Sequence, residues 1–403
     1  MAAYLHEWLA LLVRWFHLIA GVAWIGASFY FIWLDNHLRE PPTWKKQKGI
    51  KGDLWAIHGG GFYEVAKYHL GPEKMPGELH WFKWEAYSTF LSGMALLFVV
   101  YYLGSPGYLL DAGKADISMA TAAAIGLGVI AFALALYEGL IRSPLAQNGK
   151  AFGLVLYAIL VFAAWALFQL FSGRGAFIHV GAIIGTIMVA NVFLGIIPSQ
   201  RALVDSVTQG GEPDPKVARL AALAKLRSTH NNYLTLPVLF IMISNHYPML
   251  YSHPWGWAIL AAIGFITAFA RHFFNLRHRG VNRPSILVVS ACLAAALIWF
   301  VAPDTGAGAS TANAVTRISD TTVTQILEKH CTSCHSSQPS HPAFQAAPAG
   351  IVLDELSMLD SHGAQVRQAA VVTHYMPLGN TTSMSEEERQ QLGQWLISRQ
   401  QSK

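Results

Sequence analysis

Long apolar runs separated by shorter polar segments fill the first three quarters of the chain. Each run comes close to the about 20 residues that a helix needs to cross a bilayer. The pattern therefore predicts an all-α fold, an eight-helix transmembrane bundle within residues 1–303. The first run is too long for a signal-peptide core and lacks a cleavage site, so we expect it to stay as a helix. The eight runs are roughly 9–34, 84–104, 117–141, 151–171, 176–198, 233–250, 255–271 and 284–302.

Basic residues alternate between the connecting segments. The segments after the first, third, fifth and seventh helices carry 19 Lys and Arg, whereas those on the other face hold only Lys114 and Arg174. Because cytoplasmic loops are rich in Lys and Arg, this bias predicts an N-terminus outside the cytoplasm. Eight spans return the C-terminus to the same side. We expect a multi-pass protein of the bacterial cytoplasmic (inner) membrane, with its N-terminus and its last domain in the periplasm.

Composition supports a membrane protein. Of the 403 residues, 53% are hydrophobic and 13% are charged, and the net charge is +5, whereas charged residues approach a quarter of a typical soluble domain. The basic residues are spread over loops instead of forming a groove for phosphates, so we expect membrane lipid and no nucleic acid as a partner. Cys292 lies in an apolar run and the other two cysteines share one motif, which leaves no disulfide framework.

The tail after the last span has a different character. Residues 304–320 are rich in Gly, Ala, Ser and Thr and predict a flexible linker. Residues 321–403 then form a small all-α domain that carries Cys331, Cys334 and His335 in the Cys-x-x-Cys-His pattern of c-type haem attachment. Half of a zinc site is the alternative, but the sequence contains no second cysteine pair. The motif predicts one covalent haem c, with His335 as an iron ligand.

A sixth iron ligand is expected from a later loop. Met376, in the segment HYMPLGN, is our candidate, because a thioether raises the potential of a haem and suits an electron acceptor. Met358 and Met384 are the rivals, more typical of surface or core positions. A helix from Ser385 to Arg399 is expected to pack back on the helix before the motif. These residues indicate a cytochrome c domain.

Two histidines lie within predicted spans. His17 is near the outer end of the first span, with a glycine one turn later, and His179 is near the outer end of the fifth. Ionisable residues in a membrane are candidates for function. The pair predicts a second cofactor, a haem b held by His17 and His179, with His246 as a possible substitute for either. The alternative is a pair of hydrogen-bonded core histidines that bind nothing.

A second polar group gathers at the predicted cytoplasmic face. Amides, imidazoles and arginines together suit a planar, anionic, hydrogen-bonding ligand, although each residue alone has an ordinary explanation. Glu138 and Arg142, for example, have the spacing of a surface pair on one helix. The glycine run after His58 lacks the spacing of a nucleotide motif. The candidates for catalysis are His58, Glu85, Glu138, Arg142, Arg227, His230, Asn231 and Asn232, with His272 nearby.

The motifs FHLIAGVAWIGASFYF, HGGGFYEVAKY, EGLIRSP and RSTHNNYLTLPVLFIMISNHYP, followed by the haem motif, resemble the bacterial membrane-bound urate oxidases (urate hydroxylases). The first of them is also similar to the opening helix of membrane protoporphyrinogen oxidases that bind haem b. The resemblance to the urate oxidases implies oxidation of urate to 5-hydroxyisourate and transfer of the electrons to the protein's own haem c. A soluble cytochrome c or a terminal oxidase would then be the acceptor.

The resemblance leaves the place of oxidation open. If urate binds at the cytoplasmic group, Arg142 or Arg227 offsets its charge, Asn231 and Asn232 contact its edges, and His230 or His58 takes the proton. Electrons must then cross about 30 Å of hydrocarbon, which favours a haem b on the way. If urate binds near the outer face, Arg14, Arg174 and His246 become the contacts and haem b is unnecessary. A cytochrome that relays electrons from quinol and a transporter with a redox sensor are the other functions considered.

Overall fold

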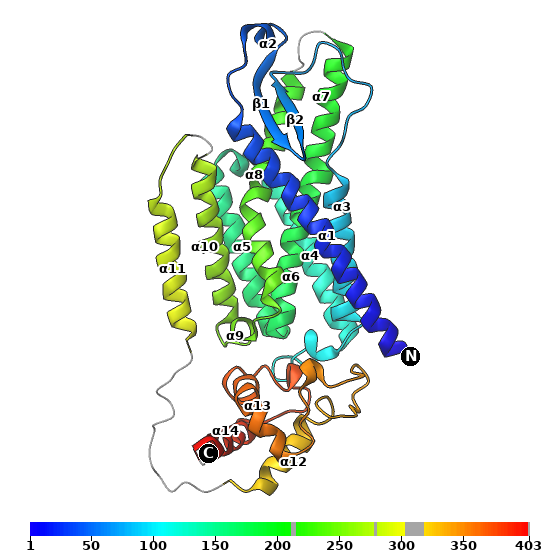
Figure 1. Cartoon of the computed structure of the whole chain (residues 1–403), viewed down its shortest axis with the longest axis vertical. Helices are drawn as coiled ribbons and strands as arrows, with labels where there is room; N and C mark the ends of the chain where they lie inside the picture. The colour runs from blue at the N-terminus through cyan, green and yellow to red at the C-terminus, as the bar shows by residue number, and fades with distance from the viewer. Residues whose placement is uncertain (211–214, 278–279, 303–317, 402–403) are drawn as a thin grey trace.

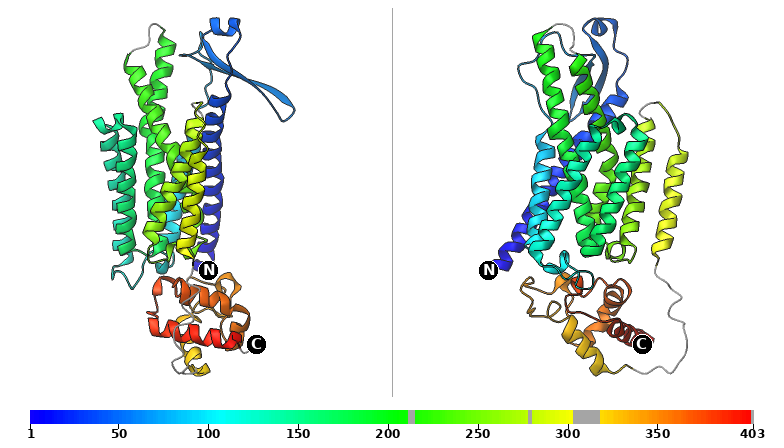
Figure 2. Two further views of the ribbon diagram at one scale, coloured as in Figure 1. Left: turned by 90° about the vertical axis from the view of Figure 1, so that its left-hand side faces the viewer. Right: turned by 180° about the vertical axis from the view of Figure 1, so that it is seen from behind.

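The computed structural model describes residues 1–210, 215–277, 280–302 and 318–401. The described chain is mostly helical and falls into an elongated helical bundle and a smaller C-terminal unit at one end of it (Figure 1). The N-terminus lies at the same end as this unit, and a β-hairpin lies at the opposite end (Figures 1 and 2). The predicted linker, residues 304–320, falls almost wholly outside the described residues.

A helix lies over each of the eight apolar ranges. Polar side chains begin several of these helices, because the oxygens of Ser118, Asn148 and Ser172 accept from otherwise unpaired amides of the first turns. The helices are α1 (Ala2–His37), α3 (Trp84–Leu96) with the π-helical turn η1 (Leu97–Tyr102), α4 (Met119–Ile141), α5 (Gly149–Leu170), α6 (Gly173–Ala190) with the π-helical turn η4 (Asn191–Ile196) and α7 (Ile197–Gln209), α8 (Pro215–Ser244), the short α9 (Pro248–Tyr251), α10 (Gly256–Arg277) and α11 (Ser285–Val301).

Five of the described helical segments are long and apolar enough to cross a membrane. They are Tyr4–His37, Met119–Ile141, Gly149–Leu170, Gly173–Gln209 and Gly256–Arg277. The fourth of these contains α6, whose residues are nearly all buried. α6 packs against α3, α4, α5 and α8, and therefore forms the centre of the bundle.

Several boundaries differ from the sequence prediction. α8 begins at Pro215, 18 residues before the predicted start, so Arg227–Asn232 lie inside a helix and not in front of one. α10 continues to Arg277, so His272 is also internal. The reason is the same in both cases. Hydropathy identifies only the apolar part of a helix, and good helix formers such as Ala, Leu, Lys and Arg continue the helix beyond that part into polar sequence.

The all-α prediction missed a β-hairpin in the segment between the first two long helices. β1 (Ile50–His58) pairs antiparallel with β2 (Gly61–Tyr68) around Gly59 and Gly60, both of which have positive φ. The short helix α2 (Thr43–Gln47) is joined to the hairpin by buried Lys45, which forms ion pairs with Asp53 and Glu64. The hairpin projects sideways from the end of the bundle (Figure 2).

The C-terminal unit has its own hydrophobic core. Its elements are α12 (Asp320–His330), α13 (Leu359–Val366), the π-helical turn η7 (Arg367–Val372) and α14 (Glu386–Gln401). Trp395 and Leu396 of α14 are buried against Ile326 and Leu327 of α12, and the Trp395 indole donates to Asp320 at 2.8 Å. The prediction that the last helix packs back on the helix before the motif is confirmed.

Candidate functional site

The Cys-x-x-Cys-His motif occupies the turn after α12. The amides of Cys334 and His335 both donate to the Cys331 carbonyl, at 3.1 and 2.8 Å, and neither cysteine is in a disulfide. The His335 Nδ1 donates to the Ile351 carbonyl at 2.9 Å. A backbone acceptor on one ring nitrogen orients an imidazole and leaves the other nitrogen for a metal. This contact leaves Nε2 of His335 as the nitrogen that would ligate an iron.

The loop that carries Met376 is held by the backbone on both sides. The Met376 amide donates to the Ala369 carbonyl at 2.9 Å, and its carbonyl accepts from the Arg389 guanidinium at 2.7 Å. The Met376 side chain packs against the same core as Cys331 and Ile351. Two thiols, an oriented imidazole and a thioether fit the donor set of a covalent haem c.

The rival methionines have other surroundings. Met384 is buried in the core of the C-terminal unit, and Met358 is exposed. Within the described part of the chain, no group of three or more His, Cys, Asp or Glu side chains is placed to hold a metal ion.

The two histidines proposed for haem b have different neighbours. The His17 Nδ1 on α1 lies 3.1 Å from the Thr89 carbonyl and 3.0 Å from the Ser92 hydroxyl. His179 is fully buried on α6, where its Nδ1 donates to the Gly175 carbonyl at 2.7 Å and its Nε2 lies 2.9 Å from the Tyr102 hydroxyl. Both nitrogens of His179 are thus engaged by the protein.

The structure does not bring His17 and His179 together. Ser92 and Tyr102 are ten positions apart in the continuous helix α3–η1, which corresponds to roughly 15 Å along its axis. α1 begins at Ala2 and not near residue 9, so His17 lies nearer the middle of its helix than the sequence suggested. His246, the proposed substitute, is exposed after the end of α8. These residues do not fit a bis-histidine haem b as they are arranged.

The predicted polar group at the other end contains a tight ion pair. The buried Arg227 guanidinium, 2% exposed, donates to both oxygens of Glu138, at 2.5 and 2.8 Å, and to the Asn191 side chain at 3.0 Å. Asn191 in turn donates to Asn231 at 2.8 Å. Arg142 reaches Glu138 at 3.2 Å but is 71% exposed. The charge of Arg227 is therefore balanced by a carboxylate of the protein itself.

Asn191 was missed by the sequence analysis. It is a fully buried amide in the π-helical turn η4, where a polar residue interrupts an apolar span. Its position inside a hydrophobic run was the signal that could have identified it. With Asn191 included, the group joins α4, η4 and α8.

The remaining predicted residues at this end are dispersed. The His230 Nδ1 lies 2.8 Å from the Tyr137 hydroxyl and its ring stacks on a phenylalanine, beside the Arg227 group. Asn232 instead accepts from Arg271 at 2.7 Å. The Tyr233 hydroxyl lies 2.6 Å from the His272 Nδ1. These contacts tie α8 to three neighbours, α4, α5 and α10.

Glu85 and His58 are separate from this group. One Glu85 oxygen lies 3.8 Å from the His80 Nε2, and the other is buried without a hydrogen bond to the described residues. His58 is exposed at the tip of the hairpin, where it pairs with Gly61. The glycines that follow His58 make the hairpin turn, so they have a structural role.

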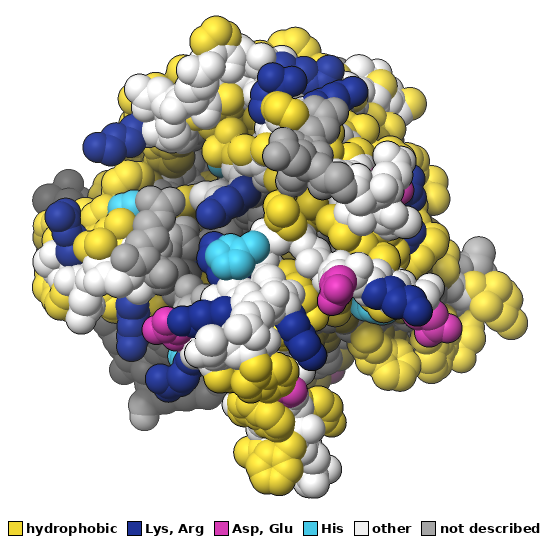
Figure 3. All heavy atoms as spheres, turned by 90° about the horizontal axis from the view of Figure 1, so that it is seen from above, with side chains coloured by type: hydrophobic (Ala, Val, Ile, Leu, Met, Phe, Trp, Pro, Cys, Tyr) yellow, Lys and Arg dark blue, Asp and Glu magenta, His cyan; other side chains and the backbone are white. Residues whose placement is uncertain are grey.

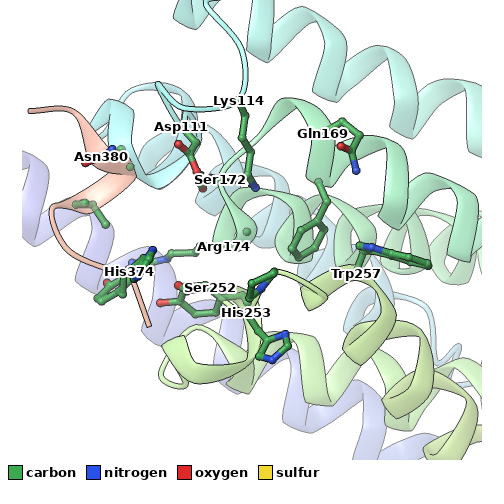
Figure 4. A pocket seen from close by; sticks show the side chains of 18 residues that line it. Asp111, Lys114, Gln169, Ser172, Arg174, Ser252, His253, Trp257, His374 and Asn380 are labelled. Carbon is green, nitrogen blue, oxygen red and sulfur yellow. Dashed lines mark ion pairs between the residues drawn. The ribbon is translucent and has the colours of Figure 1, made fainter. Parts of the chain in front are cut away.

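A cavity of about 280 Å³ lies between the C-terminal unit and the end of the bundle that faces it. The bundle contributes residues before α4, the end of α5, the start of α6 and the turn between α9 and α10 (Figure 4). The C-terminal unit contributes His374, Tyr375 and residues 378–380. Of the three outer residues considered from the sequence, Arg174 lines this cavity, whereas Arg14 and His246 do not. Its polar lining consists of Asp111, Lys114, Gln169, Ser172, Arg174, Tyr251, Ser252, His253, His374, Tyr375 and Asn380.

Basic groups dominate the charge of the cavity. The Arg174 guanidinium stacks on the Tyr108 ring at 4.2 Å, and its Nε donates to the Tyr101 hydroxyl at 3.2 Å. Lys114 donates to the Phe171 carbonyl at 3.0 Å and lies 4.0 Å from Asp111. Burial lowers the pKa of Lys114, and the nearby Asp111 partly opposes this effect. An anion in the cavity would favour the charged ammonium.

His253 adds a neutral donor. Its Nδ1 accepts from the Trp255 amide at 3.0 Å, so a neutral ring carries its proton on Nε2. Burial lowers the pKa of His253 and favours the neutral form. The cavity thus combines cationic groups, neutral donors and aromatic surfaces, which suits a small planar anion.

The comparisons with known proteins agree with the motifs in the sequence. The model of one family, described as urate oxidase N-terminal, matches residues 3–302, which is the whole bundle. No curated protein and no solved structure matches the chain. The family match confirms the urate-oxidase part of the resemblance. The chain belongs to the urate oxidase N-terminal family and is a urate-oxidase-related protein.

Proposed function

We propose that this protein is a membrane-bound urate oxidase that converts urate to 5-hydroxyisourate and delivers the electrons to a haem c in its C-terminal unit. The family match supports an oxidoreductase that acts on urate. The observation that carries the rest is the docking of the two units: the loop with the proposed iron ligand Met376 lies directly against the end of the bundle.

The backbones of the two units approach each other closely because glycines lie at the contact. The Ala112 amide donates to the Gly379 carbonyl at 3.2 Å. A Cβ on Gly107 would lie 2.6 Å from the Leu378 carbonyl oxygen, and Gly379 has a φ of +61° that favours glycine. Rings of Tyr251 and Tyr375 also meet edge to face at 5.7 Å. These contacts keep the residues next to Met376 on the bundle.

The overall reaction balances with water as the oxygen source. Urate monoanion and one water give 5-hydroxyisourate, one proton and two electrons. When bound, haem c would supply a one-electron acceptor, held by thioether bonds to Cys331 and Cys334 and ligated by His335 and Met376. A soluble cytochrome c or a terminal oxidase would then take the electrons.

The proposed setting is the bacterial cytoplasmic membrane, with an eight-helix bundle and a periplasmic C-terminal unit. The N-terminus and this unit lie at one end of the molecule (Figure 1). Lys and Arg side chains gather on the opposite end, which carries the hairpin and α7 (Figure 3). Since positive residues remain in the cytoplasm, this distribution supports the orientation.

The test adds urate without oxygen to the purified full-length protein and follows the haem absorption bands. Since each urate loses two electrons and each haem c accepts one, we expect two haem c groups to be reduced for each 5-hydroxyisourate formed. Reduction by a quinol but not by urate would contradict the proposal and favour a relay cytochrome. A pyridine-haem spectrum of the same sample counts c-type and b-type haem separately, and therefore also tests the His17 and His179 hypothesis.

A further inference from the structure

We propose that the substrate, a planar purine anion, binds in the cavity between the bundle and the C-terminal unit and not at the Arg227 group. This inference rests on the proposed function and adds the position of its site. Lys114, Arg174, Tyr251 and His253 would contact the substrate, beside the loop that carries Met376 (Figure 4).

Arg227 and Arg174 differ in whether a carboxylate balances their charge. Arg227 has both terminal nitrogens bonded to Glu138, which balances its charge, and its Nε alone lacks a partner among the described residues. Among the described residues, no carboxylate lies within ion-pair distance of Arg174, whose polar contact is a tyrosine hydroxyl. A partly buried cation without a counter-ion is costly unless an anion joins it. A bound anion would therefore balance the charge of Arg174 in the cavity, whereas Glu138 already balances the charge of Arg227.

The Tyr251 hydroxyl lacks a regular hydrogen bond. Tyr251 lines the cavity and is 3% exposed, and its hydroxyl interacts with the Tyr375 side chain but makes no hydrogen bond of regular geometry to the residues that the structure describes. Buried polar groups nearly always have a partner, so a ligand with carbonyl or N–H groups would supply the missing one.

The third argument is shape. The cavity volume of about 280 Å³ is near the lower end of small-molecule sites, which run from ~300 Å³ upwards. Phe168 and Trp257 provide flat apolar surface in its wall. Ser172 caps α6 at the same place, so the positive end of an 18-residue helix faces the site. A two-ring anion with polar edges matches these features.

The position of the cavity gives the site its redox partner. His374, Tyr375, Leu378, Gly379 and Asn380 line it, and these residues flank Met376 in the chain. A substrate held here lies beside the proposed haem ligand, at the outer end of the bundle. Its electrons would not need to cross the membrane, and no haem b is required.

Binding is tested separately from turnover. The dithionite-reduced full-length protein cannot accept electrons, so equilibrium dialysis with labelled urate measures the Kd alone. We expect Arg174→Gln to raise the Kd at least about tenfold, as for loss of a charge-assisted hydrogen bond. Tyr251→Phe, which removes only the hydroxyl, should raise it less, by about three- to tenfold. The matched control Arg201→Gln, at an exposed arginine of α7, should leave the Kd unchanged.

The outcomes separate the two proposals. If wild-type protein neither binds urate nor is reduced by it, the proposed function fails. If the wild type does both and Arg174→Gln and Tyr251→Phe keep its Kd, the function stands and the cavity is not the site. The haem spectrum and the circular dichroism of each variant show whether it has folded, and Tyr251→Phe remains a test if Arg174→Gln does not fold.

Discussion

Breaking the ion pair between Glu138 and Arg227 tests whether the Arg227 group is structural or binds substrate. Glu138→Gln leaves a guanidinium that is 2% exposed with neutral acceptors only, in place of two bonds of 2.5 and 2.8 Å to a carboxylate. Removal of one partner from a buried pair costs about 3–5 kcal/mol. We therefore expect the free energy of unfolding to fall by about this amount.

A double variant isolates the pair. Glu138→Gln combined with Arg227→Met removes the buried charge altogether, so it should recover about 1–3 kcal/mol relative to Glu138→Gln alone. The assay is unfolding of the detergent-solubilised protein by added SDS, followed by tryptophan fluorescence, with the urate Kd measured in parallel. Arg142→Gln, which removes the exposed partner of Glu138, is the control and should change stability by less than about 0.5 kcal/mol.

The reasoning is refuted by the opposite pattern. If Glu138→Gln unfolds like the wild type and its urate Kd changes tenfold or more, the Arg227 charge serves the ligand and not the fold. The predicted site at this end would then be correct, and the cavity would lose its main argument.

Three further changes test the C-terminal unit. Gly107→Val should collide with the Leu378 carbonyl and slow haem reduction by urate at least about tenfold, while dithionite reduction is unchanged; an unchanged rate would show that docking is not needed. Met376→Ala should lower the haem potential, because the thioether stabilises the reduced iron, and a redox titration that finds the wild-type potential would favour another ligand. A hydrogen bond from Lys329 lowers the pKa of Glu388 to about 2, below its ordinary 4.5. The ionised Glu388 therefore stabilises the folded unit fully above about pH 4.5, and this contribution is lost as the pH falls toward 2. In Glu388→Gln the stability of this unit should depend less on pH over this range, as measured by acid unfolding followed by circular dichroism.

The long helices could be predicted because a membrane span has to be apolar over its whole length. The ranges near α4 and α5 differ from the structure by only a few residues, since polar caps at Ser118 and Asn148 lie where the apolar runs begin. Two helices of the C-terminal unit, α12 and α14, were also predicted, whereas α13 and η7 were not. In both cases the residues that define the pattern are the ones that the structure needs, apolar side chains for the long helices and the Cys-x-x-Cys-His motif for the turn after α12.

The hairpin and the true start of α8 were missed for different reasons. Gly59 and Gly60 stand between runs rich in aromatic and branched residues, which is a hairpin signal that the search for long spans overlooked. The first half of α8 is amphipathic and polar, so hydropathy does not reveal it. Arg227 consequently looked like a loop residue with a free charge, whereas it faces Glu138 inside the bundle.

The cavity proposed for the substrate could not be predicted as a whole, because its walls come from segments far apart in the chain. Arg174, Tyr251 and His374 meet only when α6, the end of α9 and the loop before Met376 are brought together. The sequence named Arg174 as an outer alternative but contained no information on its neighbours. Docking of the two units supplies that information.

The length of the electron path to the residues that flank Met376 differs between the two ends of α6. From Asn191 to His179 this helix buries Ile183, Ile184 and Ile187, which are aliphatic side chains with no redox chemistry of their own. An electron released at the Arg227 group would have to pass this stretch of twelve residues, about 18 Å of helix, before it reached the outer end. An electron released beside Arg174 is already next to the residues that flank Met376. Under the proposed function, the docking contact that closes the cavity would also shorten the electron path, which is a physical reason for one chain to carry both units.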